Sequence, residues 1–335
     1  MPWMLKISFA NEAMATESRN APPNPRCILR GVGVPVTYLT FPHGPDHLYA
    51  AGEDGCIHLW DMKRRRIKFT LEAHKQSSIL WMGIKEESLI TQGRDGMVKI
   101  WSFTEAGWHQ TGCLKCGDLG FCRGTILSAD DNSKWIGVSS DDYSQLDLYD
   151  LRTRKNIGCL KHSGGKNKVG MIMVLKCRQK QNEQANEILI GYEDGSITLW
   201  DIRIYKLISE AQVHTESVMC MDYSYTANKG ISGSTDNKLC TWTVKEDSKI
   251  SVTDTIQVTN SGFNDILIRT DDKVFGVAGW DKQVRLFGLK KNRPLALLSY
   301  HRENVQCLAY AEDNTFACGS RDSLISIWDI YKENK

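Results

Sequence analysis

Histidine, aspartate and tryptophan recur in this chain at spacings that could support chemistry. Asp95 lies 21 positions after His74, and Trp101 follows it by six. There are three such sets: His74, Asp95, Trp101; His214, Asp236, Trp242; and His301, Asp322, Trp328. A histidine beside a carboxylate is suited to general acid–base catalysis, and additional donors could make it a metal site.

These sets belong to a longer repeat. In six places an aspartate stands six positions before an aromatic residue: 54/60, 95/101, 194/200, 236/242, 281/287 and 322/328. A seventh, weaker copy ends at Tyr149, and successive aromatics are 41, 48, 51, 42, 45 and 41 residues apart. Asp-Gly at several of these turns favours hairpins, because glycine adopts positive φ without steric cost. A period of roughly 40–45 residues that ends in Trp-Asp is typical of the WD40 β-propeller.

We therefore predict an all-β fold, a seven-bladed WD40 β-propeller over residues 26–330, preceded by a disordered N-terminal extension (1–25) and followed by a C-terminal tail (331–335). Residues 27–30 have the pattern of a strand without a hairpin partner. The chain ends six residues after Asp329, which leaves no room for the outer strand of the last blade. The N-terminal strand is predicted to fill that place and close the ring, because an open sheet edge invites aggregation.

In a ring, three histidine sets would be too far apart to converge on one substrate, so a structural role fits them better. A buried histidine or tryptophan needs a hydrogen-bond partner, and a carboxylate that accepts several N–H bonds holds its turn. We expect each histidine to hydrogen-bond towards its aspartate and each tryptophan to donate its indole N–H nearby. No nucleophile, base and oxyanion donor converge, so the chain is predicted not to be an enzyme.

The amino-acid composition limits the classes of partner and the compartment that can be expected. Lys and Arg total 42 against 40 Asp and Glu, so electrostatics favours neither nucleic acid nor a membrane surface as partner. Eleven scattered cysteines without any Asn-x-Ser/Thr sequon indicate a reducing, intracellular compartment. For a non-enzymatic scaffold we expect cytoplasm and nucleus. The Cys113-x-x-Cys116 pair lacks a second pair at zinc spacing, so neither a metal nor a cofactor is expected.

The position just before each turn aspartate is the best candidate for binding a partner. It is occupied by Glu53, Arg94, Glu193, Thr235, Trp280 and Arg321. Trp and Arg are enriched at binding hot spots, and a Trp at this turn position is expected to cover nothing of its own blade; packing on a neighbouring loop is the alternative. Arg94, Trp280 and Arg321 are predicted to form one arc around the channel mouth, suited to an acidic or aromatic-containing peptide.

Some segments resemble more specifically the G-protein-β-like group of WD40 proteins, which is similar to the WD40 subunit of the ASTRA complex. They span residues 120–127, 190–201, 230–234, 278–281 and 293–307. The resemblance implies a non-enzymatic scaffold, a monomer within hetero-complexes, in the co-chaperone machinery that matures phosphatidylinositol 3-kinase-related kinases. A substrate-receptor subunit of a cullin-type ubiquitin ligase is the alternative. Residues 22–25 hold three prolines and residues 1–25 have no heptads, so no G-protein γ subunit is expected.

Overall fold

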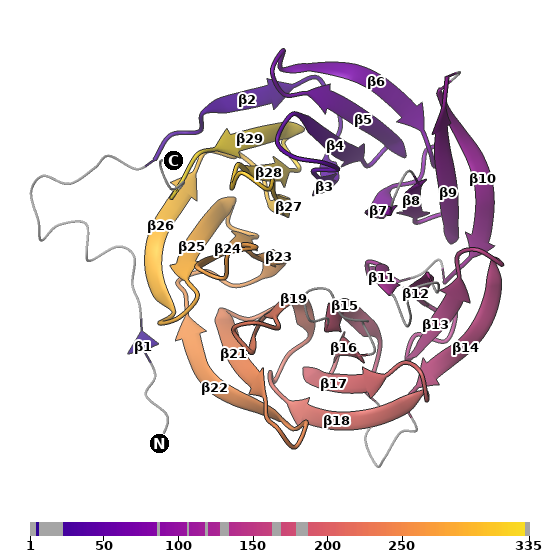
Figure 1. The fold of residues 1–335 in the computed structure, drawn as a ribbon. Helices are drawn as coiled ribbons and strands as arrows, with labels where there is room; N and C mark the ends of the chain where they lie inside the picture. Colours follow the sequence, from indigo (N-terminus) through magenta and orange to yellow (C-terminus); the bar gives the residue numbers. More distant parts are fainter. Residues whose placement is uncertain are drawn as a thin grey trace, which may run out of the picture.

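The computed structural model describes residues 23–85, 88–105, 107–117, 120–127, 134–162, 169–178 and 187–331, and the backbone of Leu5 and Lys6. Every regular element in these ranges is a β-strand, and no helix capable of crossing a membrane is found in them. The strands form seven sheets arranged radially around a central channel (Figure 1). The predicted seven-bladed propeller is therefore confirmed.

Each blade is an antiparallel sheet whose strands run in order from the channel outwards. Blade one consists of β3 (Val36–Thr40), β4 (His47–Gly52), β5 (Cys56–Asp61) and β6 (Arg66–Glu72). Blade two consists of β7 (Ile79–Lys85), β8 (Ser88–Gly93), β9 (Met97–Thr104) and β10 (Gly107–Lys115). Blade three consists of β11 (Thr125–Leu127), β12 (Trp135–Ser139), β13 (Gln145–Asp150) and β14 (Lys155–Lys161). Blade four consists of β15 (Ile172–Arg178), β16 (Glu187–Tyr192), β17 (Ser196–Asp201) and β18 (Lys206–Gln212).

The remaining blades follow the same order. Blade five consists of β19 (Val218–Ser224), β20 (Lys229–Ser234), β21 (Lys238–Val244) and β22 (Ile250–Gln257). Blade six consists of β23 (Phe263–Ile268), β24 (Val274–Gly279), β25 (Gln283–Gly288) and β26 (Arg293–Ser299). Blade seven consists of β27 (Val305–Tyr310), β28 (Phe316–Ser320), β29 (Leu324–Trp328) and, outermost, β2 (Cys27–Arg30) from the start of the chain.

The recurring aromatic residue marks a β-bulge. In blades one to six, the ladder between the third and fourth strands shifts register at this residue, as it does at Trp60 and Trp200. A bulge increases the local twist of a sheet. This position therefore sets the bend of blades one to six, and it carries a buried aromatic side chain in every blade except blade three, where Tyr149 is half-buried.

Buried apolar side chains within the described ranges form seven clusters, one at each contact between neighbouring blades. The sheets explain this distribution, because an inner strand has a blade on either side. The second strand of blade six, β24, is buried along its whole length, whereas the outermost strand β18 alternates between exposed and half-buried residues. Each blade is therefore stabilised mainly by its two neighbours.

The ring closes as predicted. Strand β2 pairs antiparallel with β29, with Cys27 opposite Ile327 and Arg30 opposite Leu324. Leu29 is buried among residues of blades one and seven, and an exposed ion pair of 3.1 Å joins Arg26 to Asp329. In Figure 1, β2 lies outside β29 and the two ends of the ring meet there.

Two features of the chain ends were not predicted. Leu5–Lys6 forms a short strand, β1, which pairs in parallel with β22 of blade five, although it lies in the segment predicted to be disordered. Tyr331, which was predicted to belong to the tail, contacts blade six. Its hydroxyl donates to the Leu295 carbonyl at 2.9 Å, and the Arg269 guanidinium donates to the Tyr331 carbonyl at 3.0 Å. The rest of the predicted extension up to residue 22, and residues 332–335, lie outside the described residues.

Candidate partner-binding site at the channel mouth

All six turn aspartates make the same hydrogen bond. In each turn the carboxylate accepts the backbone N–H of the residue two positions later, at 2.9–3.4 Å. This geometry holds the turn between the second and third strands. Glycine is needed at Gly55, where φ is 84° and an added Cβ would lie 1.5 Å from the His74 carbonyl oxygen.

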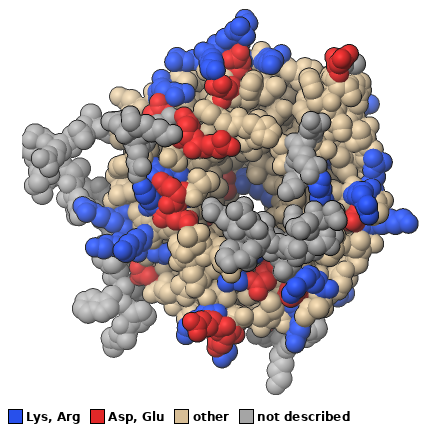
Figure 2. Space-filling view, viewed as in Figure 1, with Lys and Arg blue, Asp and Glu red and all other residues tan. Residues whose placement is uncertain are grey.

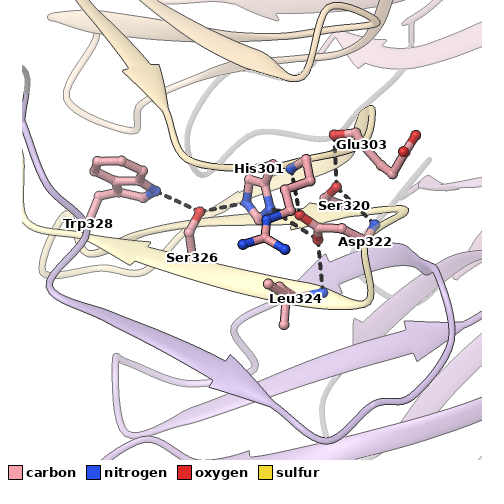
Figure 3. Close-up of polar contacts among 8 residues, drawn as sticks. His301, Glu303, Ser320, Asp322, Leu324, Ser326 and Trp328 are labelled. Atoms are coloured by element: carbon pink, nitrogen blue, oxygen red, sulfur yellow. Dashed lines mark hydrogen bonds and ion pairs between the residues drawn. The ribbon is translucent and has the colours of Figure 1, made fainter.

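In blade seven, histidine, aspartate and tryptophan form one hydrogen-bonded chain through a serine (Figure 3). The Trp328 indole N–H donates to Ser326 Oγ at 2.8 Å, and Ser326 lies 2.8 Å from His301 Nε2. His301 Nδ1 lies 3.0 Å from Asp322 Oδ2. Because a carboxylate only accepts, Nδ1 carries the proton and the neutral Nε2 accepts from the serine hydroxyl. Burial lowers the pKa of His301, which favours this neutral form.

Blade two has the same chain with a threonine. Trp101 donates to Thr91 Oγ1 at 3.0 Å, His74 Nε2 lies 2.8 Å from that hydroxyl, and His74 Nδ1 lies 2.9 Å from Asp95 Oδ2. The hydrogen bonds predicted for His74 and His301 are therefore present. The hydroxyl residue between histidine and tryptophan was not predicted, although its sequence signal is a Ser or Thr two or ten positions before the tryptophan.

The prediction for blade five is wrong in one contact. His214 Nε2 lies 2.8 Å from Ser232 Oγ, to which Trp242 also donates, but Nδ1 lies 3.7 Å from Cys240 Sγ instead of bonding to Asp236. A thiol is a weaker partner than a carboxylate. Burial lowers the pKa of His214 to about 4, so the ring is neutral near pH 7.

Blade six has Asn260 at the position of the histidine, and an arginine of β25 also binds the turn aspartate. Arg285 is almost fully buried and donates to both carboxylate oxygens of Asp281, at 3.1 and 2.6 Å. Asn260 donates to the same carboxylate at 2.8 Å. The histidine, arginine and aspartate side chains of these blades are thus engaged within their own blades, and they hold turns together without presenting a reactive group.

The channel contains a cavity of about 620 Å³ lined by inner-strand residues of all seven blades. Arg123, in the segment before β11, extends across it: its guanidinium lies 3.0 Å from Asp265 of blade six and donates to the Gln306 carbonyl of blade seven at 3.0 Å. The guanidinium also lies 5.1 Å from the Tyr38 ring centroid in blade one. Arg123 therefore connects four blades through the channel, a role that the repeat did not predict.

A second ion pair neutralises Lys176, which also lines the cavity. Lys176 of β15 lies 2.5 Å from Asp222 of β19, whose second oxygen accepts the Ile268 N–H at 2.7 Å. Asp265 and Asp222 are thus each paired with a cation and each accept a backbone N–H. Deep in the channel, the positive and negative charges cancel.

The residues before the turn aspartates occupy equivalent places, as predicted. In five blades their backbone N–H donates to a carbonyl in the segment just before the innermost strand: Glu53 to Pro35, Arg94 to Ser78, Glu193 to Met171, Trp280 to Gly262 and Arg321 to Asn304. They therefore stand at one end of the channel, which we call the mouth. Glu53, Arg94 and Arg321 all line the cavity and are exposed.

Arg94 is supported by an aromatic ring that the sequence did not single out. Its guanidinium lies 4.4 Å from the centroid of Phe121, which lines the same cavity and is 56% exposed. Neither Arg94 nor Arg321 lies within 4 Å of a carboxylate of the described residues. Arg94, Phe121, Arg321 and Glu53 together form what we call the mouth cluster.

Trp280 lies beside this cluster, and the expectation that it covers nothing of its own blade is wrong. Its ring lies flat on Gly262, where an added Cβ would come within 2.1 Å of the indole, and its N–H donates to Asn264 at 2.8 Å. Asn264 lines the cavity, whereas Trp280 itself does not. The indole remains 36% exposed and is held in one orientation.

Away from the mouth cluster, positively and negatively charged side chains lie among one another. Figure 2, which looks onto one face of the ring, shows Lys and Arg interspersed with Asp and Glu around the rim. Among the described residues, no three His, Cys, Asp or Glu side chains are grouped so that they could hold a metal ion. Cys113 is exposed and Cys116 is buried. The distinctive feature is therefore the mouth cluster, where two cations have no carboxylate partner within the described part of the chain.

Comparison with known proteins agrees with this architecture. The family model described as "WD domain, G-beta repeat" matches residues 24–61, 205–243 and 292–329. Each match begins with the outer strand of one blade, or with β2, and continues through three strands of the next. This offset explains why the ring needs β2 to complete its last blade.

Similarity extends over nearly the whole chain. Guanine nucleotide-binding protein subunit beta-like protein 1 of Mus musculus is 33% identical over 317 residues, which cover 92% of this chain and 97% of the relative. ASTRA-associated protein 1 of Schizosaccharomyces japonicus is 24% identical and that of Schizosaccharomyces pombe 23%, each covering 92% of this chain and 99% of the relative. The chain therefore belongs to the WD40-repeat family of protein-interaction scaffolds, within the group that includes guanine nucleotide-binding protein subunit beta-like protein 1.

Proposed function

We propose that this chain is a non-enzymatic scaffold in the co-chaperone complexes that mature phosphatidylinositol 3-kinase-related kinases, and that it acts in the cytoplasm and nucleus as one subunit of a hetero-complex. The observation that carries the proposal is similarity along 92% of the chain to relatives named ASTRA-associated protein 1. The similarity covers 99% of each relative's length, so it is not confined to the three segments that the repeat model matches.

The geometry supports a scaffold in two ways. The histidines that could have acted as bases are buried and bonded to groups of their own blade, so they serve the turns. The mouth presents exposed arginine and aromatic side chains, the residue types that dominate binding energy at protein interfaces.

Affinity purification of the tagged full-length chain from cells tests the proposal. We expect subunits of the kinase co-chaperone machinery and one or more phosphatidylinositol 3-kinase-related kinases among the recovered proteins. Depletion of the chain should lower the steady-state amounts of these kinases, and cell fractionation should find the chain in both compartments. Recovery of cullin-adaptor subunits without kinase co-chaperones would instead support a ubiquitin-ligase substrate receptor and overturn the proposal.

A further inference from the structure

We infer that the outer edge of β10 in blade two binds an extended segment of a partner protein by β-strand addition, so that the segment becomes a fifth strand of that blade. This inference deepens the proposed function and rests on it for the identity of the partner. The partner is defined here by its chemistry: an extended segment in which apolar side chains alternate with uncharged polar ones.

The outer edge of β10 lacks the features that normally prevent strand pairing. An edge strand is commonly protected by charged residues, by proline or by being short. With nine residues β10 is the longest described strand, and its last residue, Lys115, is its only charged residue or proline. Every other outermost strand has such a feature: three charged residues in β6, two each in β14 and β18, an Arg-Pro start in β26, a length of four residues in β2, and an edge already paired in β22.

The backbone of β10 is free on its outer side. Within the described ranges, residues 107–114 make no backbone-to-backbone hydrogen bond outside their ladder with β9. Tyr149 of blade three donates to the Lys115 carbonyl at 3.0 Å, which closes this edge only at its end. His109, Gln110 and Thr111 are exposed. The backbone N–H and C=O groups that point away from β9 are therefore available to another strand along residues 107–111.

Strand β22 shows that an outermost strand of this ring can accept a further strand. In blade five, β1 pairs with β22 on the side away from β21, with Leu5 opposite Ile256. In Figure 1, β10 lies at the outer rim of blade two with no strand outside it. The same kind of pairing is therefore open to β10, and no segment of the described chain makes it.

Alternate side chains of an added strand would enter the gap between blades one and two. Trp108 of β10 lies edge-on to Phe103, at 5.3 Å between ring centroids, and to Tyr49 of blade one, at 6.4 Å. Across the gap, Phe69 of β6 is paired with Leu59, which packs in the same apolar cluster as Trp108. Phe103 is 62% exposed and Phe69 is 37% exposed. Because every second side chain of a strand points to the same side, apolar residues at alternate positions of the segment would cover these rings.

Charge does not select this occupant. Charged residues of both signs border the edge: Lys68 and Glu72 in β6, Glu105 in the β9–β10 turn, and Arg154 beside Gly112. Main-chain hydrogen bonds and apolar contact therefore define the segment, as they do in other complexes formed by strand addition.

Selection from a random twelve-residue phage library on the purified full-length chain tests this inference without any knowledge of the partner. We expect the selected peptides to carry apolar residues at alternate positions. Hydrogen exchange, measured by mass spectrometry with and without the best peptide, should become slower for the β10 amides and stay unchanged at the channel mouth.

N-methylated forms of the best peptide test the strand geometry. In a strand, successive N–H groups point to opposite edges, so only one of the two sets of alternate residues can donate to β10. Methylation of that set should raise the Kd, measured by fluorescence anisotropy, at least tenfold. Methylation of the other set should leave the Kd within twofold.

Variants of the chain separate the β10 edge from a general effect of charge. H109K/Q110K places two lysines on the edge, the device that protects natural edge strands, and should raise the Kd at least tenfold. F103A removes part of the apolar contact and should raise the Kd severalfold. I204K/I208K, the matched control, adds two lysines at exposed apolar positions in the β17–β18 turn and in β18, and should leave the Kd within twofold.

Several results would overturn the inference. They are recovery of no peptide, slower exchange confined to other strands or to the channel mouth, equal binding by the two methylated peptides, or an equal effect of I204K/I208K. Because these measurements use the isolated chain, such a failure leaves the co-chaperone proposal standing. Failure to recover co-chaperones from cells would not affect the peptide result.

Discussion

Arg123 and Asp265 form an ion pair of 3.0 Å that crosses the channel from blade three to blade six. In a propeller each repeat contacts its two neighbours, so contacts between distant blades are few. This pair and the bond from Arg123 to the Gln306 carbonyl join blades that do not share an apolar cluster. These two contacts therefore link blades three, six and seven across the channel.

Replacing Arg123 with methionine should destabilise the ring by about 3 kcal/mol, because it leaves the Asp265 carboxylate buried and without its cation. Urea unfolding followed by tryptophan fluorescence measures this loss. R123M/D265N should recover most of it, since a neutral amide can still accept the Leu308 N–H that Asp265 accepts at 2.9 Å. A double variant as unstable as R123M would show that the arginine acts through packing alone.

The R123M defect should also depend on pH. Burial raises the pKa of Asp265 in the folded chain, and Arg123 offsets this effect in part. Without Arg123 the pKa of Asp265 in the folded chain rises further. At pH values between the ordinary carboxyl pKa and this raised pKa, the folded chain holds a proton that the unfolded chain has released. Stability of the variant then falls as pH rises. The difference from wild type should therefore be smaller at pH 5 than at pH 7.

His214 should make the ring sensitive to acid. Its folded pKa of about 4 lies below the ordinary 6.5, so the unfolded state binds the proton first and stability is lost as pH falls from 6.5 towards 4. The loss should be on the order of 3 kcal/mol by linkage. His214→Ala should cost about 1–3 kcal/mol near pH 7, for a broken buried hydrogen bond, and flatten this pH dependence. An unchanged slope between pH 6.5 and 4.5 would assign the acid sensitivity to other groups.

Removal of residues 26–31 should destabilise the whole ring. The deletion takes away β2, exposes the edge of β29 and uncovers the apolar cluster that buries Leu29. A chain that lacks only residues 26–31 should melt many degrees below the full-length chain in differential scanning calorimetry. R26A is the matched control, because it breaks only the exposed pair with Asp329. A melting temperature within one or two degrees of full length would contradict the role of β2.

Gly262→Ala should displace Trp280. The glycine has φ of 86°, and the new methyl group would overlap the indole. The hydrogen bond to Asn264 should be lost, which the indole N–H signal in NMR spectra would report. Gly44→Ala is the control, since Gly44 also has positive φ, 60°, but nothing lies within 4 Å of an added Cβ. An unmoved indole signal in G262A would show that the ring can slide without cost.

Much of the fold could be predicted because it is periodic. The aspartate-to-aromatic spacing reports a turn in all six copies and a bulge in all of them but the last, and the missing strand of the last blade follows from the length left after Asp329. The hydrogen bonds of the histidines were predictable for the same reason. The exception is His214, whose Nδ1 lies beside the Cys240 thiol of β21 instead of the Asp236 carboxylate.

Contacts across the ring have no period and were missed. Arg123 contacts blades one, six and seven, whose residues lie 86 to 183 positions away from it. Phe121 lies in the irregular third repeat, so its meeting with Arg94 has no counterpart elsewhere in the sequence. Trp280 was placed at the correct end of its blade, but its support by Gly262 depends on a backbone conformation that the residue pattern does not encode.

The closing strand also fixes when the molecule can be completed during its synthesis. Cys27 pairs with Ile327, so β2 leaves the ribosome 300 residues before its partner. At elongation rates of roughly 5–20 residues per second, that interval lasts roughly 15–60 seconds. Throughout it the apolar strand that carries Leu29 has no sheet to join. Any product that terminates before blade seven remains an open arc, and the nascent chain must be shielded from other chains until its last strand emerges.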